Sequence, residues 1–272
     1  MAILTMIVTA ALIILAVKFG LLRGIDQIAN AMQWSAKARG QVTGFATSVP
    51  ELVCLVAAGL AGVWDAGLWN IASSNIINFL LIATAVGWFK QWKDLFNRRF
   101  ADEIGFASAA VLAPVFLMQL ELDRHWAMVP VLVGFFVVYR LVDRTVNAPE
   151  EAGGTAAQTV GSLPVGLIMA ATSLLIIAVV GIFLGDATKT VVEQLGVHPA
   201  IAGCILGLCT SIPELISFFS VYQTSRAAGR LQELDDTQEA LDNLTSSNMA
   251  NVGVVYPVGL AAYLLATGVF GV

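Results

Sequence analysis

Glu51 and Glu214 each follow a proline in two short segments of nearly the same sequence. Residues 44–52 read Gly-Phe-Ala-Thr-Ser-Val-Pro-Glu-Leu, and residues 207–215 read Gly-Leu-Cys-Thr-Ser-Ile-Pro-Glu-Leu. Both segments lie within long apolar stretches. A carboxylate inside a lipid bilayer is energetically expensive, and it usually faces an ion pathway or a buried partner. Two such carboxylates in repeated positions therefore indicate an ion site.

A second repeated segment follows each glutamate and adds hydroxyl and amide groups. Residues 70–78 read Asn-Ile-Ala-Ser-Ser-Asn-Ile-Ile-Asn, and residues 243–251 read Asn-Leu-Thr-Ser-Ser-Asn-Met-Ala-Asn. Because a proline lacks an N–H and clashes with the preceding turn, the helix must loosen before each glutamate and can turn carbonyl groups toward a ligand. Two bidentate glutamates and two threonine carbonyl groups would supply about six of the 6–8 oxygens that Ca²⁺ takes.

A cage of this kind must take up other cations when Ca²⁺ leaves. The two carboxylates neutralise a divalent ion, and without it they repel each other unless Na⁺ or protons replace it. This competition is the physical basis of antiport. Mg²⁺ fits less well, because it demands octahedral geometry and gives up its water reluctantly.

The composition places these motifs in a membrane protein. Of the 272 residues, 58% are hydrophobic and 12% are charged, whereas soluble domains carry about 25% charged residues. A bilayer-crossing helix needs about 20 mainly apolar residues. We therefore predict an all-α, polytopic membrane protein with about eight transmembrane helices, at residues 3–22, 41–63, 66–89, 104–120, 126–142, 162–184, 197–222 and 244–270. Polar connections are expected at 90–103, 143–161 and 226–243, with Asp242 in a solvated or capping position near a span end.

Positive charge predicts the orientation of these spans. All Lys and Arg residues except Arg124 and Lys189 fall in connections after odd-numbered spans, so these connections are expected in the cytoplasm and the amino terminus outside. The two Pro-Glu segments then run through the membrane in opposite senses. We predict two inverted-topology repeats, 1–142 with spans one to five and 162–272 with spans six to eight, joined by a cytoplasmic linker at 143–161. Inverted repeats with interrupted helices recur in secondary transporters.

The duplicated pattern Gly-x-x-Thr-Ser-x-Pro-Glu, followed by Asn-x-x-x-Ser-Asn-x-x-Asn, resembles the alpha-repeats of the sodium/calcium exchanger family within the Ca²⁺/cation antiporter superfamily. The resemblance implies exchange of Na⁺ for Ca²⁺ by alternating access, with the first and sixth spans sliding across a rigid core. Ca²⁺ and Na⁺ are then transported ions, and no cofactor is implied. The cation ligands that the resemblance implies are the carboxylates of Glu51 and Glu214, the carbonyl groups of Gly44, Thr47, Gly207 and Thr210, and the side chains of Ser48, Ser74, Asn78, Ser211, Ser247 and Asn251.

The chain departs from the family pattern in ways that bear on function. Members close to the sodium/calcium exchangers often carry Asp where this chain has Asn251, which leaves the Na⁺ stoichiometry open. The family usually has ten spans, and eight are expected here. Two alternatives stay open: a naturally short member, completed by assembly into a homo-oligomer, or a truncated chain.

Other function classes fit less well. An H⁺-coupled exchanger of Ca²⁺ or another divalent cation stays as the alternative, because a buried carboxyl group can take up a proton near neutral pH. An enzyme is not expected: the chain contains no His-Glu-x-x-His motif, and His125 and His198 fall in connections expected outside. A net charge of −5 does not suggest a nucleic-acid partner. We expect an integral protein of a prokaryotic inner (cell) membrane, with the lipid bilayer and its ions as partners.

Overall fold

The computed structural model describes residues 1–146, 161–229, 231 and 234–270, which form helices and connecting turns without a β-strand among them. The first half contains α1 (Ala2–Ala16), the π-helix η1 (Val17–Leu21), α2 (Leu22–Met32), α3 (Ala36–Thr47), α4 (Val49–Leu60), α5 (Trp64–Phe89), α6 (Trp92–Leu95), the 3₁₀ helix η2 (Arg98–Phe100), α7 (Ala101–Gln119) and α8 (Met128–Val146). The second half contains α9 (Leu163–Glu193), α10 (Pro199–Thr210), α11 (Ile212–Ala227), α12 (Asp235–Ala250), the π-helix η3 (Asn251–Val255) and α13 (Tyr256–Phe270).

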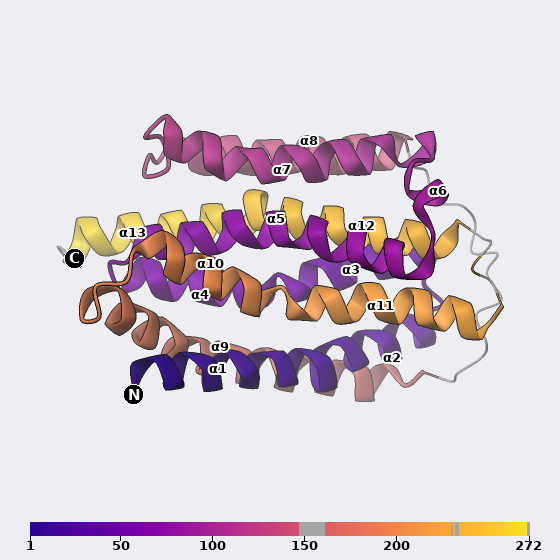
Figure 1. The fold of residues 1–272 in the computed structure, drawn as a ribbon, viewed down its shortest axis with the longest axis horizontal. Coiled ribbons are helices and arrows are strands. Elements are labelled where there is room, and N and C mark those ends of the chain that lie inside the picture. The colour runs from indigo at the N-terminus through magenta and orange to yellow at the C-terminus, as the bar shows by residue number, and fades with distance from the viewer. Residues whose placement is uncertain (147–160, 230, 232–233, 271–272) are drawn as a thin grey trace.

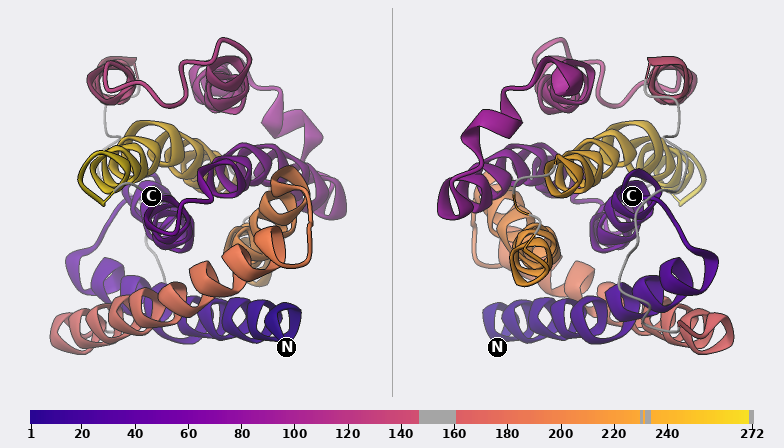
Figure 2. Two further views of the ribbon diagram at one scale, coloured as in Figure 1. Left: turned by 90° about the vertical axis from the view of Figure 1, so that its left-hand side faces the viewer. Right: turned by 90° about the vertical axis from the view of Figure 1, so that its right-hand side faces the viewer.

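The helices run roughly along one axis and lie in three groups, as Figures 1 and 2 show. On one side, α1 and α2 lie against α9. The middle group holds α3, α4, α5, α10, α11, α12 and α13, and the α7–α8 hairpin covers the other side. The groups pack through apolar clusters, one of which joins Ile13 and Leu184 of the first group to Cys54 and Leu206 of the middle group. The middle group therefore lies shielded on two sides.

The predicted all-α, polytopic class is confirmed. Among the described residues, 7 helices are long and apolar enough to cross a membrane. Helix α8, the predicted fifth span, is not among the seven, but it lies beside α7 and runs the length of the same hairpin (Figure 1). The start of α1 and the end of α13 lie at the same end of the bundle, as an even number of crossings requires.

The two repeats run in opposite senses, as predicted. In Figure 1, the pair α3–α4 passes from right to left and the pair α10–α11 from left to right. Their packing is exchanged between repeats: α3 of the first lies along α12 of the second, and α10 of the second lies along α5 of the first. The four motif segments are thus brought together in the middle group.

Two predicted boundaries are wrong. The first span, expected at 3–22, continues as one helical segment through η1 and α2 to Met32. The expected polar connection at 226–243 is helical from Asp235, where α12 begins. Its polar residues are buried against α3 and α7, so tertiary packing overrides their low hydropathy. Most of the predicted linker at 143–161 lies outside the described residues, and the repeat boundaries stay predictions.

Two equivalent glycines permit the close packing between repeats. A Cβ added to Gly40 of α3 would lie 2.4 Å from the Glu239 carbonyl oxygen of α12, and one added to Gly203 of α10 would lie 2.5 Å from the Ala66 carbonyl oxygen of α5. Both obstacles are backbone atoms, which cannot rotate away. These contacts therefore require glycine.

We expect Gly40→Ala and Gly203→Ala each to lower stability by about 1–3 kcal/mol, because overpacking outweighs the gain in helix propensity. Thermal unfolding of the purified protein in detergent measures the effect. Gly105→Ala on α7 is the matched control, since no atom lies within 4 Å of its added Cβ. Equal melting temperatures for the three variants would contradict the inferred packing.

Candidate cation site

Both Pro-Glu segments interrupt a helix, as predicted, at the serine two residues before the proline. Ser48 separates α3 from α4 with φ −81° and ψ −3°, and Ser211 separates α10 from α11 with φ −83° and ψ 0°. The proline lies in the first turn of the helix that follows, where its missing N–H costs least. The same sequence thus makes the same break twice.

The breaks place two carboxylates in the interior of the bundle. Glu51 lies in the first turn of α4 and Glu214 in the first turn of α11, and neither has exposed surface. The two side chains lie within electrostatic reach of each other. In each carboxylate, Oε1 accepts a serine hydroxyl, whereas Oε2 is buried without a hydrogen-bond partner. A buried acceptor without a partner is costly, and a bound cation would remove that cost.

Serine hydroxyls link each carboxylate to the opposite repeat. Ser74 Oγ donates to Glu51 Oε1 (2.9 Å) and lies 3.0 Å from Ser211 Oγ. Ser247 Oγ donates to Glu214 Oε1 (3.0 Å) and lies 3.1 Å from Ser48 Oγ. Because a hydroxyl carries one proton, Ser74 must accept its second bond from Ser211. Each glutamate is therefore held by its own repeat and braced by the other.

The threonines and glycines of the motifs lie beside these groups. Thr47 is close to Glu214 and Thr210 to Glu51, so each threonine faces the carboxylate of the other repeat. The Gly44 carbonyl group already accepts from the Thr47 hydroxyl (3.1 Å) and from Ser48 Oγ (3.0 Å). The Gly207 carbonyl group accepts from Thr210 Oγ1 (3.4 Å). Both glycines also let their helix approach the opposite repeat, since an added Cβ would lie 2.4 Å or less from Asn243 O or Ser73 Oγ.

Two asparagines add further oxygens. Asn78 of α5 donates from Nδ2 to Asn248 Oδ1 (3.1 Å), and Asn251 donates from Nδ2 to Asn75 Oδ1 (2.9 Å). The Oδ1 atoms of Asn78 and Asn251 are buried without partners, like the Oε2 atoms of the glutamates. Asn251 is the first residue of η3, and single π turns often mark functional sites.

The structure adds three asparagines that the sequence prediction left out of the site. Asn70 Oδ1 accepts from Thr210 Oγ1 (3.2 Å). Asn75 donates to the Ala110 carbonyl group of α7 (2.9 Å), and Asn248 donates to the Asn75 carbonyl group (3.2 Å). These residues position the groups around them. Their place in the duplicated Asn-x-x-x-Ser-Asn pattern was the available signal.

The assembled groups suit a hard cation held by mixed oxygen donors. No group of three His, Cys, Asp or Glu side chains among the described residues is arranged to hold a metal. The central residues instead offer two carboxylates with hydroxyl, amide and carbonyl oxygens from both repeats. Hard cations such as Ca²⁺ and Na⁺ accept such donors, whereas a zinc or copper site would use nitrogen or sulfur ligands. We call Glu51, Glu214, Ser74, Ser247, Asn78 and Asn251 the central cage.

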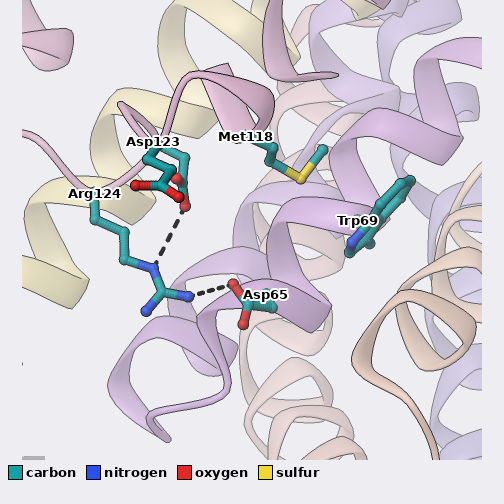
Figure 3. A pocket seen from close by; sticks show the side chains of 6 residues that line it. Asp65, Trp69, Met118, Asp123 and Arg124 are labelled. Atoms are coloured by element: carbon teal, nitrogen blue, oxygen red, sulfur yellow. Dashed lines mark hydrogen bonds and ion pairs between the residues drawn. The ribbon is translucent and has the colours of Figure 1, made fainter. Parts of the chain in front are cut away.

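A separate pocket lies at the end of the bundle where α5 begins and the α7–α8 turn packs (Figure 3). Its volume is about 430 Å³, and Arg124 donates to Asp65 and lies 3.5 Å from Asp123 Oδ2. Because this arginine already neutralises neighbouring acids, the pocket is a weaker cation site than the cage. Its lining residues are Asp65, Trp69, Met118, Glu121, Asp123 and Arg124, and none belongs to the repeated Thr-Ser-x-Pro-Glu segments.

Comparisons with known proteins identify the family and the fold. Residues 1–143 and 165–267 match the family model described as sodium/calcium exchanger protein. No curated protein matches the chain. Solved structures of the sodium-calcium exchanger NCX_Mj share the fold. The structure soaked with 2.5 mM Na⁺ and 10 mM Sr²⁺ aligns at TM-score 0.56 and 21% identity over 97% of this chain and 83% of the other. The structure soaked with zero Na⁺ and Ca²⁺ aligns at TM-score 0.54 and 20% identity over the same shares.

We expect Ser74→Ala to weaken Ca²⁺ binding by about 10- to 100-fold, because a hydrogen bond to a charged group contributes about 1.5–3 kcal/mol. Ser73→Ala is the matched control. The Ser73 hydroxyl is bonded most closely to carbonyl groups of its own helix, at 2.7 Å to Trp69 O. Isothermal titration calorimetry on the purified protein measures both affinities, and equal losses in the two variants would argue against a specific role for Ser74.

Proposed function

The chain belongs to the sodium/calcium exchanger family, and we propose that it exchanges Na⁺ for Ca²⁺ across the membrane by alternating access. The family and the shared fold support a cation/Ca²⁺ antiporter. Na⁺ as the coupling ion and the central cage as the transport site are the further steps of the proposal. Both steps go beyond family membership, because they assign roles to particular residues of this chain.

The observation that carries the proposal is the set of buried oxygens without hydrogen-bond partners. Glu51 Oε2, Glu214 Oε2, Asn78 Oδ1 and Asn251 Oδ1 come from both repeats. A stable interior normally satisfies its polar atoms. Acceptors left open around two carboxylates are what a cage for exchangeable cations needs, since any bonded donor would have to leave before the ion entered.

The two carboxylates also explain why exchange is obligatory. With Ca²⁺ bound, the two negative charges of Glu51 and Glu214 are compensated. With Ca²⁺ absent, they repel each other inside a low-dielectric interior. Na⁺ ions taken up by the same oxygens and the neighbouring serine hydroxyls relieve this repulsion. Because the empty, charged cage is costly, the carrier moves mainly with ions bound.

The layer formed by α1, α2 and α9 is the part we propose to slide. The layer lies against the middle group through α4. Within the layer, α2 packs on α9 through small residues. An added Cβ at Gly24 would lie 2.8 Å from the Gly166 carbonyl oxygen, and one at Gly166 would lie 2.7 Å from the Gly24 carbonyl oxygen. Small residues let membrane helices approach closely, so α2 and α9 can move together as one rigid layer.

We expect Glu51→Gln combined with Glu214→Gln to abolish Ca²⁺ transport, because two neutral amides cannot compensate a divalent ion. Uptake of radiolabelled Ca²⁺ into Na⁺-loaded proteoliposomes measures the loss. Glu193→Gln at the exposed end of α9 is the matched carboxyl-to-amide control and should transport normally. Retained uptake in the double variant would remove the cage from the mechanism.

The same vesicles identify the coupling ion. Uptake should require internal Na⁺ and should not occur in Na⁺-free vesicles that hold a pH gradient. Uptake driven by the pH gradient alone would replace Na⁺ with H⁺ as the coupling ion. A proton would then occupy the glutamates in place of Na⁺.

We expect Asn251→Asp to lower the Na⁺ concentration that half-saturates Ca²⁺ exchange, because a third carboxylate strengthens the attraction for Na⁺ in the Ca²⁺-free cage. The substitution also removes the donor to Asn75 Oδ1 and should cost about 1 kcal/mol of stability. The Na⁺ dependence of exchange and thermal unfolding measure the two effects. Asn97→Asp in the exposed connection before η2 is the control for added charge, and an unchanged Na⁺ dependence at Asn251 would place this residue outside the Na⁺ sites.

A further inference from the structure

A second group of buried charged and amide side chains lies where α3, α7, α8 and α12 meet. It is near the beginning of α12, at the end of the bundle opposite the start of α1. The group consists of Lys37, Gln41, Glu103, Asp143, Gln238 and Asp242. None of these residues belongs to the central cage. Asp242 is 1% exposed, which corrects the expectation of a solvated or capping position for it.

One carboxylate of the group is fully engaged. Asp143 forms an ion pair with Lys37 and accepts from Gln41 Nε2 (2.9 Å), and Arg140 Nη1 lies 3.7 Å from its Oδ2. Lys37 and Arg140 are therefore the ion-pair partners of Asp143. This part of the group serves to join α3 to α8.

Asp242 is only partly compensated, because Lys37 lies within electrostatic reach of it but forms its ion pair with Asp143. Asp242 Oδ2 accepts from Gln238 Nε2 (2.8 Å), and its Oδ1 is buried without a hydrogen-bond partner. It forms no ion pair within the part of the chain that the structure describes. Gln41 lies within hydrogen-bonding reach of Asp242, and its Nε2 donates to Asp143 at 2.9 Å. A buried carboxylate with an unused oxygen is destabilising unless a cation shares the site.

A second carboxylate faces the same amide group. Gln238 Nε2 also donates to Glu103 Oε1 on α7, at 3.3 Å. The partially positive amide nitrogen thus occupies a position between two carboxylates, where a cation would be attracted. If the Gln238 side chain turned about its terminal bond, it would present Oε1 to that cation as a further ligand. Two carboxylates and an amide oxygen from two helices make a hard-cation site.

The position of Asp242 connects this group to the cage. Asp242 precedes Ser247 by five residues on α12, which corresponds to a rise of about 7.5 Å along the helix. Between them, Asn243 carries another buried oxygen without a partner, Oδ1. On the facing helix, Gly40 and Gly44 place no side chain over Asp242 or Ser246. Oxygen acceptors therefore continue along α12 from the bundle end to the cage.

We propose that Glu103, Gln238 and Asp242 form a second divalent-cation site, at which Ca²⁺ binds on its way between the central cage and the end of the bundle where α12 begins. That end carries the basic connections that we expect in the cytoplasm. The choice of Ca²⁺ as occupant rests on the proposed function. The existence of the site rests on the two carboxylates and the shared amide.

Equilibrium binding of radiolabelled Ca²⁺ to the purified full chain in Na⁺-free detergent tests the proposal. The Glu51→Gln/Glu214→Gln variant removes the cage, and it should still bind Ca²⁺. Adding Asp242→Asn to that variant should weaken the remaining binding about tenfold or more, since Ca²⁺ affinity depends on the charge of the ligand set. Adding Asp235→Asn instead should leave it unchanged, because Asp235 is exposed on the same helix.

The outcomes separate the two sites. No binding in the cage variant, or equal binding after Asp242→Asn and Asp235→Asn, would overturn the second site and leave the proposed function standing. The same Ca²⁺ stoichiometry in wild type and cage variant would overturn the cage instead. If the combined variants do not elute as a folded species in size-exclusion chromatography, Asp242→Asn and Glu103→Gln are each made in the wild-type chain. Each should remove one of two Ca²⁺ equivalents, and retention of both would overturn the second site.

Discussion

The structure depends on two carboxylates buried together at membrane depth. Each charge placed in the centre of a bilayer costs about 2.5–3.5 kcal/mol on insertion scales, and two like charges close together add repulsion. In each of Glu51 and Glu214, only one of the two carboxylate oxygens accepts a serine hydroxyl, and the other has no partner. The folded protein thus retains uncompensated negative charge, which a cation can neutralise.

The two carboxylates are held in position because helices of each repeat pack against helices of the other. Because α3 lies along α12 and α10 along α5, the serine at each helix break meets a serine of the opposite repeat. A movement that separated the repeats would break both serine pairs and leave both carboxylates less satisfied. The middle group is therefore best suited to remain rigid, and a change of access is more easily made by the layer of α1, α2 and α9 that packs against it.

Much of the proposed cage was predictable because its two motifs each occur twice in the sequence. Duplication identified Glu51, Glu214 and their serines, and the prolines located both helix breaks. Local hydropathy failed at Asp235–Asn243, since those polar residues are helical only because α3 and α7 bury them. For the same reason, the burial of Asp242 beside Glu103 could not be foreseen: the two residues are far apart in sequence and meet through Gln238. The roles of Asn75 and Asn248 depended on side-chain directions that a linear pattern does not contain.

The two repeats are not equivalent at their final asparagines, and the α7–α8 hairpin provides a physical reason. Asn78 lies within the uninterrupted helix α5, whereas Asn251 begins the π-helix η3. Phe136 of α8 packs so closely on Gly253 of η3 that an added Cβ would lie 2.3 Å from its side chain. A π turn accommodates an extra residue and shifts the side chains that follow it. The hairpin thus contacts the η3 turn that begins at Asn251, so the position of this amide in the proposed cage is linked to packing outside the repeated motifs.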